Sequence, residues 1–251
     1  MRVALFVTCV NDAVYPATGI ATVKLLERLG VEVAFPPGQT CCGQPQFNTG
    51  YRRESEPLVR RMARVFAGYD HIVTPSGSCA AMVREAYPRI ARKAAAEGRG
   101  TELTEAADAL APRMYELTEF LVDVLGVTDV GAYFPHTVTY HPSCHGLRTL
   151  GLGDRPRRLL EAVKGLELRE LPDAEECCGF GGTFALKNPD VSVAMGADKV
   201  RNAASTGADV LCGADNSCLM HIGGILHRQD APMRALHIAE ILLSTEAEPP
   251  V

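Results

Sequence analysis

The sequence predicts an α/β fold made of two tandem domains, related by a pseudo-two-fold repeat, each with a largely parallel sheet. The first observation behind this prediction is a repeat of cysteines. Each half holds a single cysteine, an adjacent pair followed by glycine, and a last cysteine: Cys9, Cys41, Cys42 and Cys79, then Cys144, Cys177, Cys178 and Cys218. The single cysteine and the pair are separated by 31 residues in one half and 32 in the other. A period this long indicates a duplicated domain and not a short-repeat solenoid.

The other two observations are the order of the predicted elements and the length of the chain. Short apolar runs alternate with helical segments in both halves, which is typical of open, largely parallel α/β sheets. The 251 residues suit two domains of about 100–150 residues. Apolar residues make up 47% of the chain, enough for each half to bury a core. The predicted domains are residues 1–130 and 131–251, with a boundary between Val127 and Pro135.

In the first half, Val3–Val7 is an unbroken apolar run that suits a strand buried on both faces. Gly30 is a candidate helix C-cap, and Pro36 ends the second strand. We expect strands at Val3–Val7, Val31–Phe35, His71–Pro75 and Met114–Leu117, and helices at Ile20–Leu29, Glu56–Phe66, Ala80–Tyr87 and Glu119–Leu125. The segment Ala94–Pro112 has little apolar pattern and is expected to be a surface excursion with some helix.

The second half repeats this order. We expect strands at Val138–His141, Leu166–Leu171 and Ala208–Leu211, and helices at Pro156–Val163, Val191–Ala204 and Leu219–Leu226. The segments Glu116–Leu121 and His237–Leu242 correspond to each other near the ends of the two halves. The acidic tail Ser244–Val251 is expected to fray.

All eight repeated cysteines follow the carboxyl ends of predicted strands. In open α/β sheets this edge is where ligands bind, because several loops converge there. We therefore expect the four thiols of each half to meet at one point. We call Cys9, Cys41, Cys42 and Cys79 the first centre, and Cys144, Cys177, Cys178 and Cys218 the second centre.

Charge and composition narrow the function classes. The formal charge of −5 argues against a nucleic-acid-binding protein, which would show a basic face. No apolar run approaches the roughly 18 residues of a membrane span. The short apolar N-terminal stretch lacks the length and cleavage site of a signal peptide. The protein is therefore expected in the cytoplasm, where thiols are kept reduced and structural disulfides are rare.

The thiols have several possible roles. Buried cysteines can act as small hydrophobic residues, but chance would not repeat four positions at matched spacing. Structural zinc sites usually use Cys-x-x-Cys turns, which are missing here because Ser76 and Asp215 stand three residues before the last cysteines. Adjacent cysteines suit two iron atoms of one cluster. The pattern favours an iron–sulfur cluster in each domain, with zinc in one site and dithiol redox chemistry left open.

The two Cys…Cys-Cys-Gly…Cys units resemble the cysteine-rich domain pair of the CCG family, and Thr139–His145 opens the second unit in the manner of that family. The family includes a subunit of heterodisulfide reductase and the iron–sulfur subunits of glycolate and glycerol-3-phosphate oxidising complexes. The short two-domain form, Ser76–Cys79 and Asn216–Gly224 are similar to its lactate-utilisation members. The resemblance covers nearly the whole chain, and it is more specific for the family than for a substrate.

The resemblance implies an electron-transfer subunit that is not itself the catalyst, with a [4Fe–4S] cluster held by the four cysteines of each centre. It implies two partners, lactate utilisation proteins B and C or equivalent subunits, in the oxidation of L-lactate to pyruvate. The CCG subunit of heterodisulfide reductase carries Cys-x-x-Cys at the end of each unit and holds a five-thiolate cluster. Ser76 and Asp215 replace the first cysteine of that pair, which argues against such a cluster here. A heterodisulfide-type redox subunit and a zinc-stabilised assembly subunit are the alternatives.

Further residues are candidates for supporting a cluster. Gly43 and Gly179 follow the paired cysteines, where glycine lets the backbone turn sharply and approach a bulky group. Ser76 and Asp215 could supply an oxygen ligand or serve as turn residues. The histidines that flank cysteines of the second centre are His141, His145 and His221, each either a hydrogen-bond donor to a cluster or a structural residue. Of these, we expect His145 and His221 to support a cluster. Cys212 has no counterpart in the first half and is expected to be a buried, inert thiol.

Overall fold

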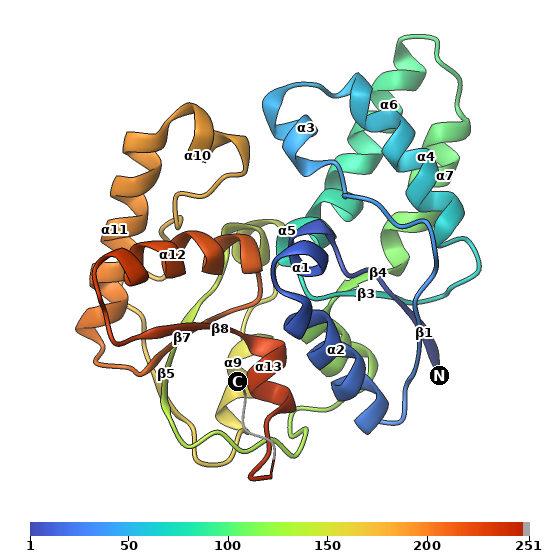
Figure 1. Cartoon of the computed structure of the whole chain (residues 1–251). Coiled ribbons are helices and arrows are strands. Elements are labelled where there is room, and N and C mark those ends of the chain that lie inside the picture. Colours follow the sequence, from blue (N-terminus) through green and yellow to red (C-terminus); the bar gives the residue numbers. More distant parts are fainter. Residues whose placement is uncertain (248–251) are drawn as a thin grey trace.

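The computed structural model describes residues 1–247 and has two four-stranded sheets, one in each half, in which every strand pair is parallel (Figure 1). The strand order is β2-β1-β3-β4 in the first sheet and β6-β5-β7-β8 in the second. The α/β class and the tandem repeat are thereby confirmed. Within residues 1–247, no helix combines the length and the apolar character needed to cross a membrane.

The elements follow the same order in both halves. The first half contains β1 (Arg2–Leu5), α1 (Cys9–Ala13), α2 (Pro16–Arg28), β2 (Glu32–Ala34), α3 (Gln44–Thr49), α4 (Glu56–Val65), β3 (Ile72–Thr74), α5 (Gly77–Ala81), α6 (Tyr87–Ala96), α7 (Glu102–Leu110), β4 (Met114–Glu116) and α8 (Leu117–Glu119). The second contains β5 (Thr137–His141), α9 (Arg155–Glu161), β6 (Glu167–Arg169), α10 (Thr183–Lys187), α11 (Pro189–Ser205), β7 (Val210–Gly213), α12 (Asn216–Arg228), β8 (Arg234–His237) and α13 (Ile238–Leu243). Helical turns of π type follow α5, α8 and Cys144.

The register of the two sheets repeats as well. Arg2 of β1 lies opposite Glu32 of β2, and Thr137 of β5 lies opposite Glu167 of β6. These two pairs occupy corresponding positions, since the same number of residues separates Arg2 from Cys9 and Thr137 from Cys144. The duplication seen in the cysteines therefore extends to the backbone pairing that positions them.

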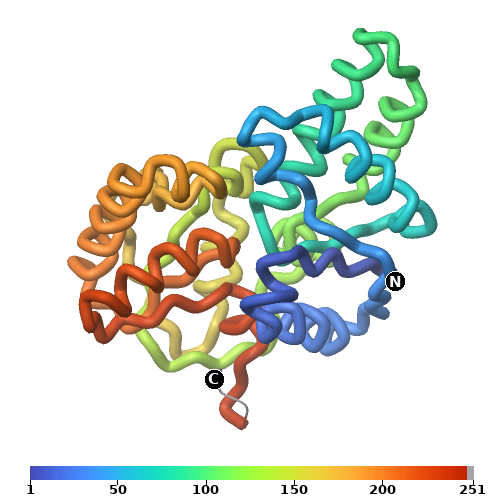
Figure 2. Tube along the Cα trace, turned by 45° about the horizontal axis from the view of Figure 1, so that its top comes forward, coloured from blue at the N-terminus to red at the C-terminus, as the bar shows by residue number. Residues whose placement is uncertain are grey.

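The two halves share part of their core. Helices α2 and α13 lie side by side between the lobes (Figures 1 and 2), and one cluster of buried side chains joins Leu25 and Leu26 of α2 to Ile238 and Ile241 of α13. Two smaller clusters belong to one half each. The shared cluster fixes the two sheets against each other. The division at residues 130 and 131 stays a prediction.

The expectation for Ala94–Pro112 was wrong in one respect. The segment has an apolar pattern, because α7 buries Leu103, Ala107 and Leu110 against α4 and α6. These residues recur at helical spacing, but alanine is a weak signal of a buried face. The α6–α7 hairpin stands out from the rest of the first lobe in Figure 2.

Other boundaries also differ from the sequence predictions. The helix expected at Ala80–Tyr87 starts at Gly77, because Ser76 caps its first turn, and helical structure continues through a π-type turn to Ala96. Helices α1, α3 and α10 are short and were not expected. Ser244 does not fray, since its Oγ donates to the Tyr133 carbonyl at 2.9 Å and its side chain is buried. Residues 248–251 of the expected tail lie outside the described part of the chain.

Candidate metal centres

The structure brings the four thiols of the first centre together at the carboxyl edge of the first sheet. Cys9 opens α1, the adjacent Cys41 and Cys42 lie in the loop after β2, and Cys79 lies in α5. The Sγ atoms of Cys9 and Cys41 are 3.6 Å apart, and those of Cys42 and Cys79 are 3.4 Å apart. Four thiols from three segments of the chain therefore form one potential ligand set.

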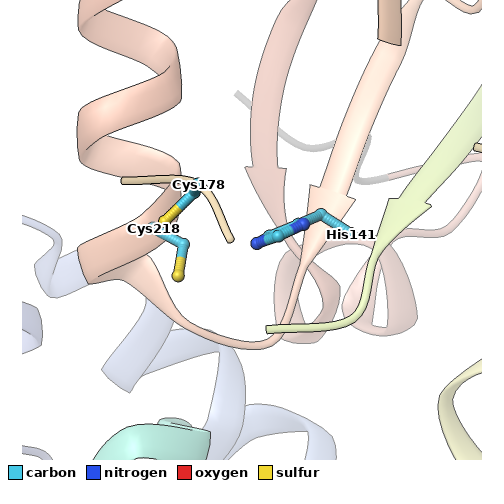
Figure 3. Close-up of side chains that lie close together, drawn as sticks. All are labelled: His141, Cys178 and Cys218. Carbon is cyan, nitrogen blue, oxygen red and sulfur yellow. The ribbon is translucent and has the colours of Figure 1, made fainter. Parts of the chain in front are cut away.

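The second centre forms in the same way at the edge of the second sheet. Cys177 and Cys218 both raise the pKa of Cys144, and both also raise the pKa of Cys178, so the four thiols of this centre act on one another. His141 also lies at this centre, and the first centre has no corresponding histidine. The His141 ring points from the end of β5 toward Cys178 and Cys218 (Figure 3), and ligand atoms of the three residues lie within 4.8 Å of one another.

His141 is an unusual buried polar residue. Its side chain is 1% exposed, and neither ring nitrogen has a hydrogen-bond partner among the described residues. Burial, with a smaller contribution from the Lys199 ammonium, lowers the pKa of His141 to about 4. Buried polar atoms without partners are rare and mark strain, function or a missing ligand. The ring is therefore a neutral donor and acceptor that faces the thiols.

Each centre holds one thiol that is favoured as a thiolate. Hydrogen bonds from Cys42 and Cys9 lower the pKa of Cys41 to about 2, and the Gly43 N–H, 3.5 Å from its Sγ, contributes in the same direction. In the second centre, hydrogen bonds from Cys144 and Cys178 lower the pKa of Cys177 in the same manner. Thiolates, and not thiols, are the metal ligands.

The glycines after the paired cysteines have backbone conformations that disfavour other residues. Gly43 has a φ of +88° and Gly179 a φ of +90°. A Cβ on Gly43 would lie 2.8 Å from Cδ1 of Leu58, whereas one on Gly179 would lie 2.4 Å from the carbonyl oxygen of Ser192. The Gly179 N–H points at Cys177 Sγ, 3.3 Å away. Both turns thus direct a backbone N–H toward a thiolate.

Ser76 and Asp215 cap the helices that carry the last cysteines. The Ser76 hydroxyl accepts from the Cys79 N–H at 3.4 Å. Asp215 accepts from the Ser217 N–H at 3.1 Å with one oxygen and from the Ser78 N–H at 2.7 Å with the other. Asp215 therefore caps α12 and also reaches α5 of the other half. These contacts occupy the side-chain oxygens as helix caps.

The N-termini of α5 and α12 meet at the interface between the halves. Gly77 N donates to the Ala214 carbonyl at 3.3 Å, and Asn216 Nδ2 donates to Asn11 Oδ1 at 2.9 Å. Asn11 in turn donates to the Pro75 carbonyl at 3.0 Å. Since Asn11 and Asn216 each lie two residues from a cysteine, this buried network places the two centres next to the same interface.

Three other sequence candidates lie away from the thiols or have protein partners. Nε2 of His145 lies 3.2 Å from Nε2 of Gln44 in the first half. His221 lies on α12, with Nε2 3.1 Å from the Ser192 carbonyl. Cys212 lies in the core shared by both halves, where burial raises the pKa of its thiol. The sequence pattern favours His145 and His221 as supporting histidines and leaves out His141, although all three flank cysteines. Like the cysteines, His141 lies at the carboxyl end of a predicted strand. This position is the sequence signal that favours His141.

A cavity opens at the first centre. Its volume is about 330 Å³, and all four thiols of the centre line it. Phe180, Thr183 and Leu186 of the second half also line it, and the exposed surface of the lining is mainly apolar. The residues present fit an iron–sulfur cluster: each centre offers four thiols, the first faces a cavity, and the second has an unpartnered histidine directed at its sulfurs.

Comparison with known proteins agrees with this arrangement. Residues 3–84 and 138–223 match the family described as the cysteine-rich domain, CCG, once in each half. The chain belongs to the CCG family. Among its relatives in this family are proteins named lactate utilization protein A. The one from Geobacillus thermodenitrificans is 52% identical over 242 residues, covering 96% of this chain and 98% of the relative. The one from Oceanobacillus iheyensis is 48% identical, covering 96% of each.

One solved structure has a similar fold at low sequence identity. A hypothetical protein from Helicobacter pylori superposes with a TM-score of 0.63 at 11% identity. The match covers 96% of this chain and 48% of that protein. At this identity the likeness concerns the fold alone.

Proposed function

We propose that this CCG protein is a cytoplasmic iron–sulfur electron-transfer subunit that takes part in lactate utilisation. The observation that carries the proposal is the pair of four-thiol centres beside one interface. Thiolate sets of this size hold [4Fe–4S] clusters, and such clusters supply one-electron transfer. The lactate role rests on relatives near 50% identity over nearly the full length, which bear the name lactate utilization protein A.

The residues suit a relay. The eight cysteines would hold one cluster in each half, Gly43 and Gly179 direct N–H groups at thiolates, and the cavity gives a redox partner access to the first centre. Oxidation of lactate to pyruvate releases two electrons and two protons. The two thiol centres suit the transfer of single electrons and do not account for the removal of the two protons. We therefore infer that partner subunits, equivalent to lactate utilisation proteins B and C, hold the substrate.

The test compares the chain alone with the chain plus its partner subunits. The anaerobically purified chain should contain iron and sulfide, yet give no lactate-dependent dye reduction. Addition of the partners should produce that activity, and a Cys42→Ser chain should not support it. Lactate oxidation by the single chain would place the substrate site here and contradict the relay.

Zinc in the second centre is the second candidate, and one observation favours it. His141, Cys178 and Cys218 lie close enough for a mixed nitrogen–sulfur site of the kind that zinc accepts. In that case the second half would have a structural role. Metal analysis of Cys42→Ser protein, which keeps only the second centre intact, distinguishes zinc from iron.

A further inference from the structure

The two centres differ at one position that the repeat makes equivalent. His141 precedes Cys144 by three residues, and Phe6 precedes Cys9 by three. Phe6 is buried in an apolar cluster with Cys42 and Cys79, and its ring makes an edge contact with Phe66 at 5.8 Å between centroids. At the same place in the second half stands a ring with two polar atoms. The two halves therefore have the same set of thiols but a different side chain at this position, Phe6 in the first half and His141 in the second.

The polar atoms of His141 need a partner that the described protein residues do not provide. Both nitrogens are inaccessible and have no hydrogen-bond partner among the described residues, and an unsatisfied buried polar group destabilises the fold. The ring points toward Cys178 and Cys218, whose sulfurs lie within 4.8 Å of a ring nitrogen (Figure 3). A thiol is a weak acceptor, whereas a metal-bound thiolate is a negatively charged one. A cluster bound at the second centre would thus give the ring N–H an acceptor.

We propose that His141 donates a ring N–H to the thiolate pair Cys178 and Cys218 and gives the second centre a higher reduction potential than the first. The proposal rests on the proposed function, because it requires clusters in both halves. A reduced cluster is more negative than an oxidised one, so a donor at its sulfurs stabilises the reduced form. Phe6 offers no donor to the first centre. Electrons that arrive through the cavity at the first centre would therefore move on to the second.

The second half has another group that acts in the same direction. Lys199 on α11 is buried, donates to the Asp173 carbonyl at 2.6 Å, and lies close enough to influence the charge of His141 and Cys178. Its positive charge also stabilises the reduced, more negatively charged form of a cluster at the second centre. Lys199 would remain in the His141 variants. Those variants should therefore reduce the difference in reduction potential between the two centres, and some difference can remain.

The test is an anaerobic redox titration of the whole protein, followed by electron paramagnetic resonance. Signals are assigned with Cys42→Ser and Cys178→Ser chains, each of which retains one centre. His141→Phe, which copies the first half, should lower the potential of the second centre by about 59 mV or more, a tenfold change in a one-electron equilibrium constant. The first centre should not change, and iron content should stay the same.

Three further variants control this result. His141→Gln keeps an N–H donor and should restore much of the potential. Phe6→His should raise the potential of the first centre. His136→Phe alters a histidine just before the other end of β5 and should change neither potential. If His141→Phe shifts neither centre while iron is retained, the proposal is wrong. Zinc at the second centre would also overturn it, whereas absence of iron from both centres would overturn the proposed function with it.

Discussion

Each of the two centres has four thiols, a glycine turn and a capped helix, but the surroundings of the centres differ. At the first centre, Phe6 is buried in an apolar cluster with Cys42 and Cys79, and the four thiols line a cavity of about 330 Å³. The second has His141 and a glycine turn packed tightly on α11. Duplication thus preserved the ligands and allowed the neighbours to diverge. In the proposed relay, a redox partner reaches the first centre through the cavity, and His141 tunes the second centre.

The largest expected effect separates the ligands from the remaining thiol. Cys42→Ser and Cys178→Ser should each remove one cluster and about half of the iron, since a [4Fe–4S] site uses four thiolates. Cys212→Ser is the matched control and should leave the iron content unchanged, because Cys212 lies in the shared core. Iron analysis of the three anaerobically purified chains measures this. Equal loss of iron from Cys212→Ser would make that residue a ligand.

The glycine turns should respond unequally to alanine. Gly43→Ala and Gly179→Ala both place a Cβ on a positive φ, which costs roughly 1–2 kcal/mol. At Gly43 the Leu58 side chain can move aside, but at Gly179 the Cβ meets the Ser192 backbone carbonyl. Overpacking of this kind adds roughly 1–3 kcal/mol. Denaturant unfolding should show the larger loss for Gly179→Ala, and equal losses would contradict the difference in packing.

The two helix caps should also differ. Asp215→Ala removes acceptors from N–H groups in both halves and should destabilise the protein by roughly 2–3 kcal/mol, because hydrogen bonds to charged groups are strong. Ser76→Ala removes a cap in one half and should cost about 1 kcal/mol. Asp215→Asn, which keeps one strong acceptor, should fall between them. Chemical denaturation measures all three, and a smaller effect for Asp215→Ala than for Ser76→Ala would refute the bridging role.

A pH test compares corresponding caps at the ends of β4 and β8. Burial raises the pKa of Glu116 to about 7, and burial lowers the pKa of His237 to about 4. Between pH 4.5 and 7 the folded state holds a proton on Glu116 that the unfolded state has lost. Glu116 therefore contributes stability that falls as the pH rises through this window, by up to about 1.4 kcal/mol per pH unit.

Glu116→Gln isolates this contribution. Histidines with lowered pKa values act in the opposite direction, since they destabilise the folded state as the pH falls toward 4, but they are present in both proteins. The free energy of unfolding of wild type minus that of Glu116→Gln should decline from pH 4.5 to 7 and then level off. A difference that is flat with pH would show that Glu116 titrates normally.

The sequence predicted the sheets and the thiol sets for definite physical reasons. Strands buried on both faces need continuous apolar runs, as in Val3–Val7, and cysteines placed after such runs reach one edge of a sheet. It favoured His145 over His141 as a supporting residue, although both flank Cys144. The choice depends on direction: His141 ends β5 beside the thiols, whereas His145 lies beyond Cys144 and contacts Gln44.

The interface was beyond the reach of local sequence patterns. Asp215 bonds Ser78 across 137 residues, and no spacing rule signals such a pair. The shared core around α2 and α13 likewise depends on how two finished halves dock. Helix α7 was underestimated since Ala107, a small residue, forms part of its buried face.

The most direct test of the account is quantification of iron, acid-labile sulfide and zinc in the anaerobically purified full chain, combined with electron paramagnetic resonance during stepwise reduction. Two [4Fe–4S] clusters predict about eight iron and eight sulfide per chain, without zinc. They also predict two signals that appear at different potentials, with the higher one lost in Cys178→Ser. Stoichiometric zinc, iron without sulfide, or two centres that reduce at the same potential would contradict the account.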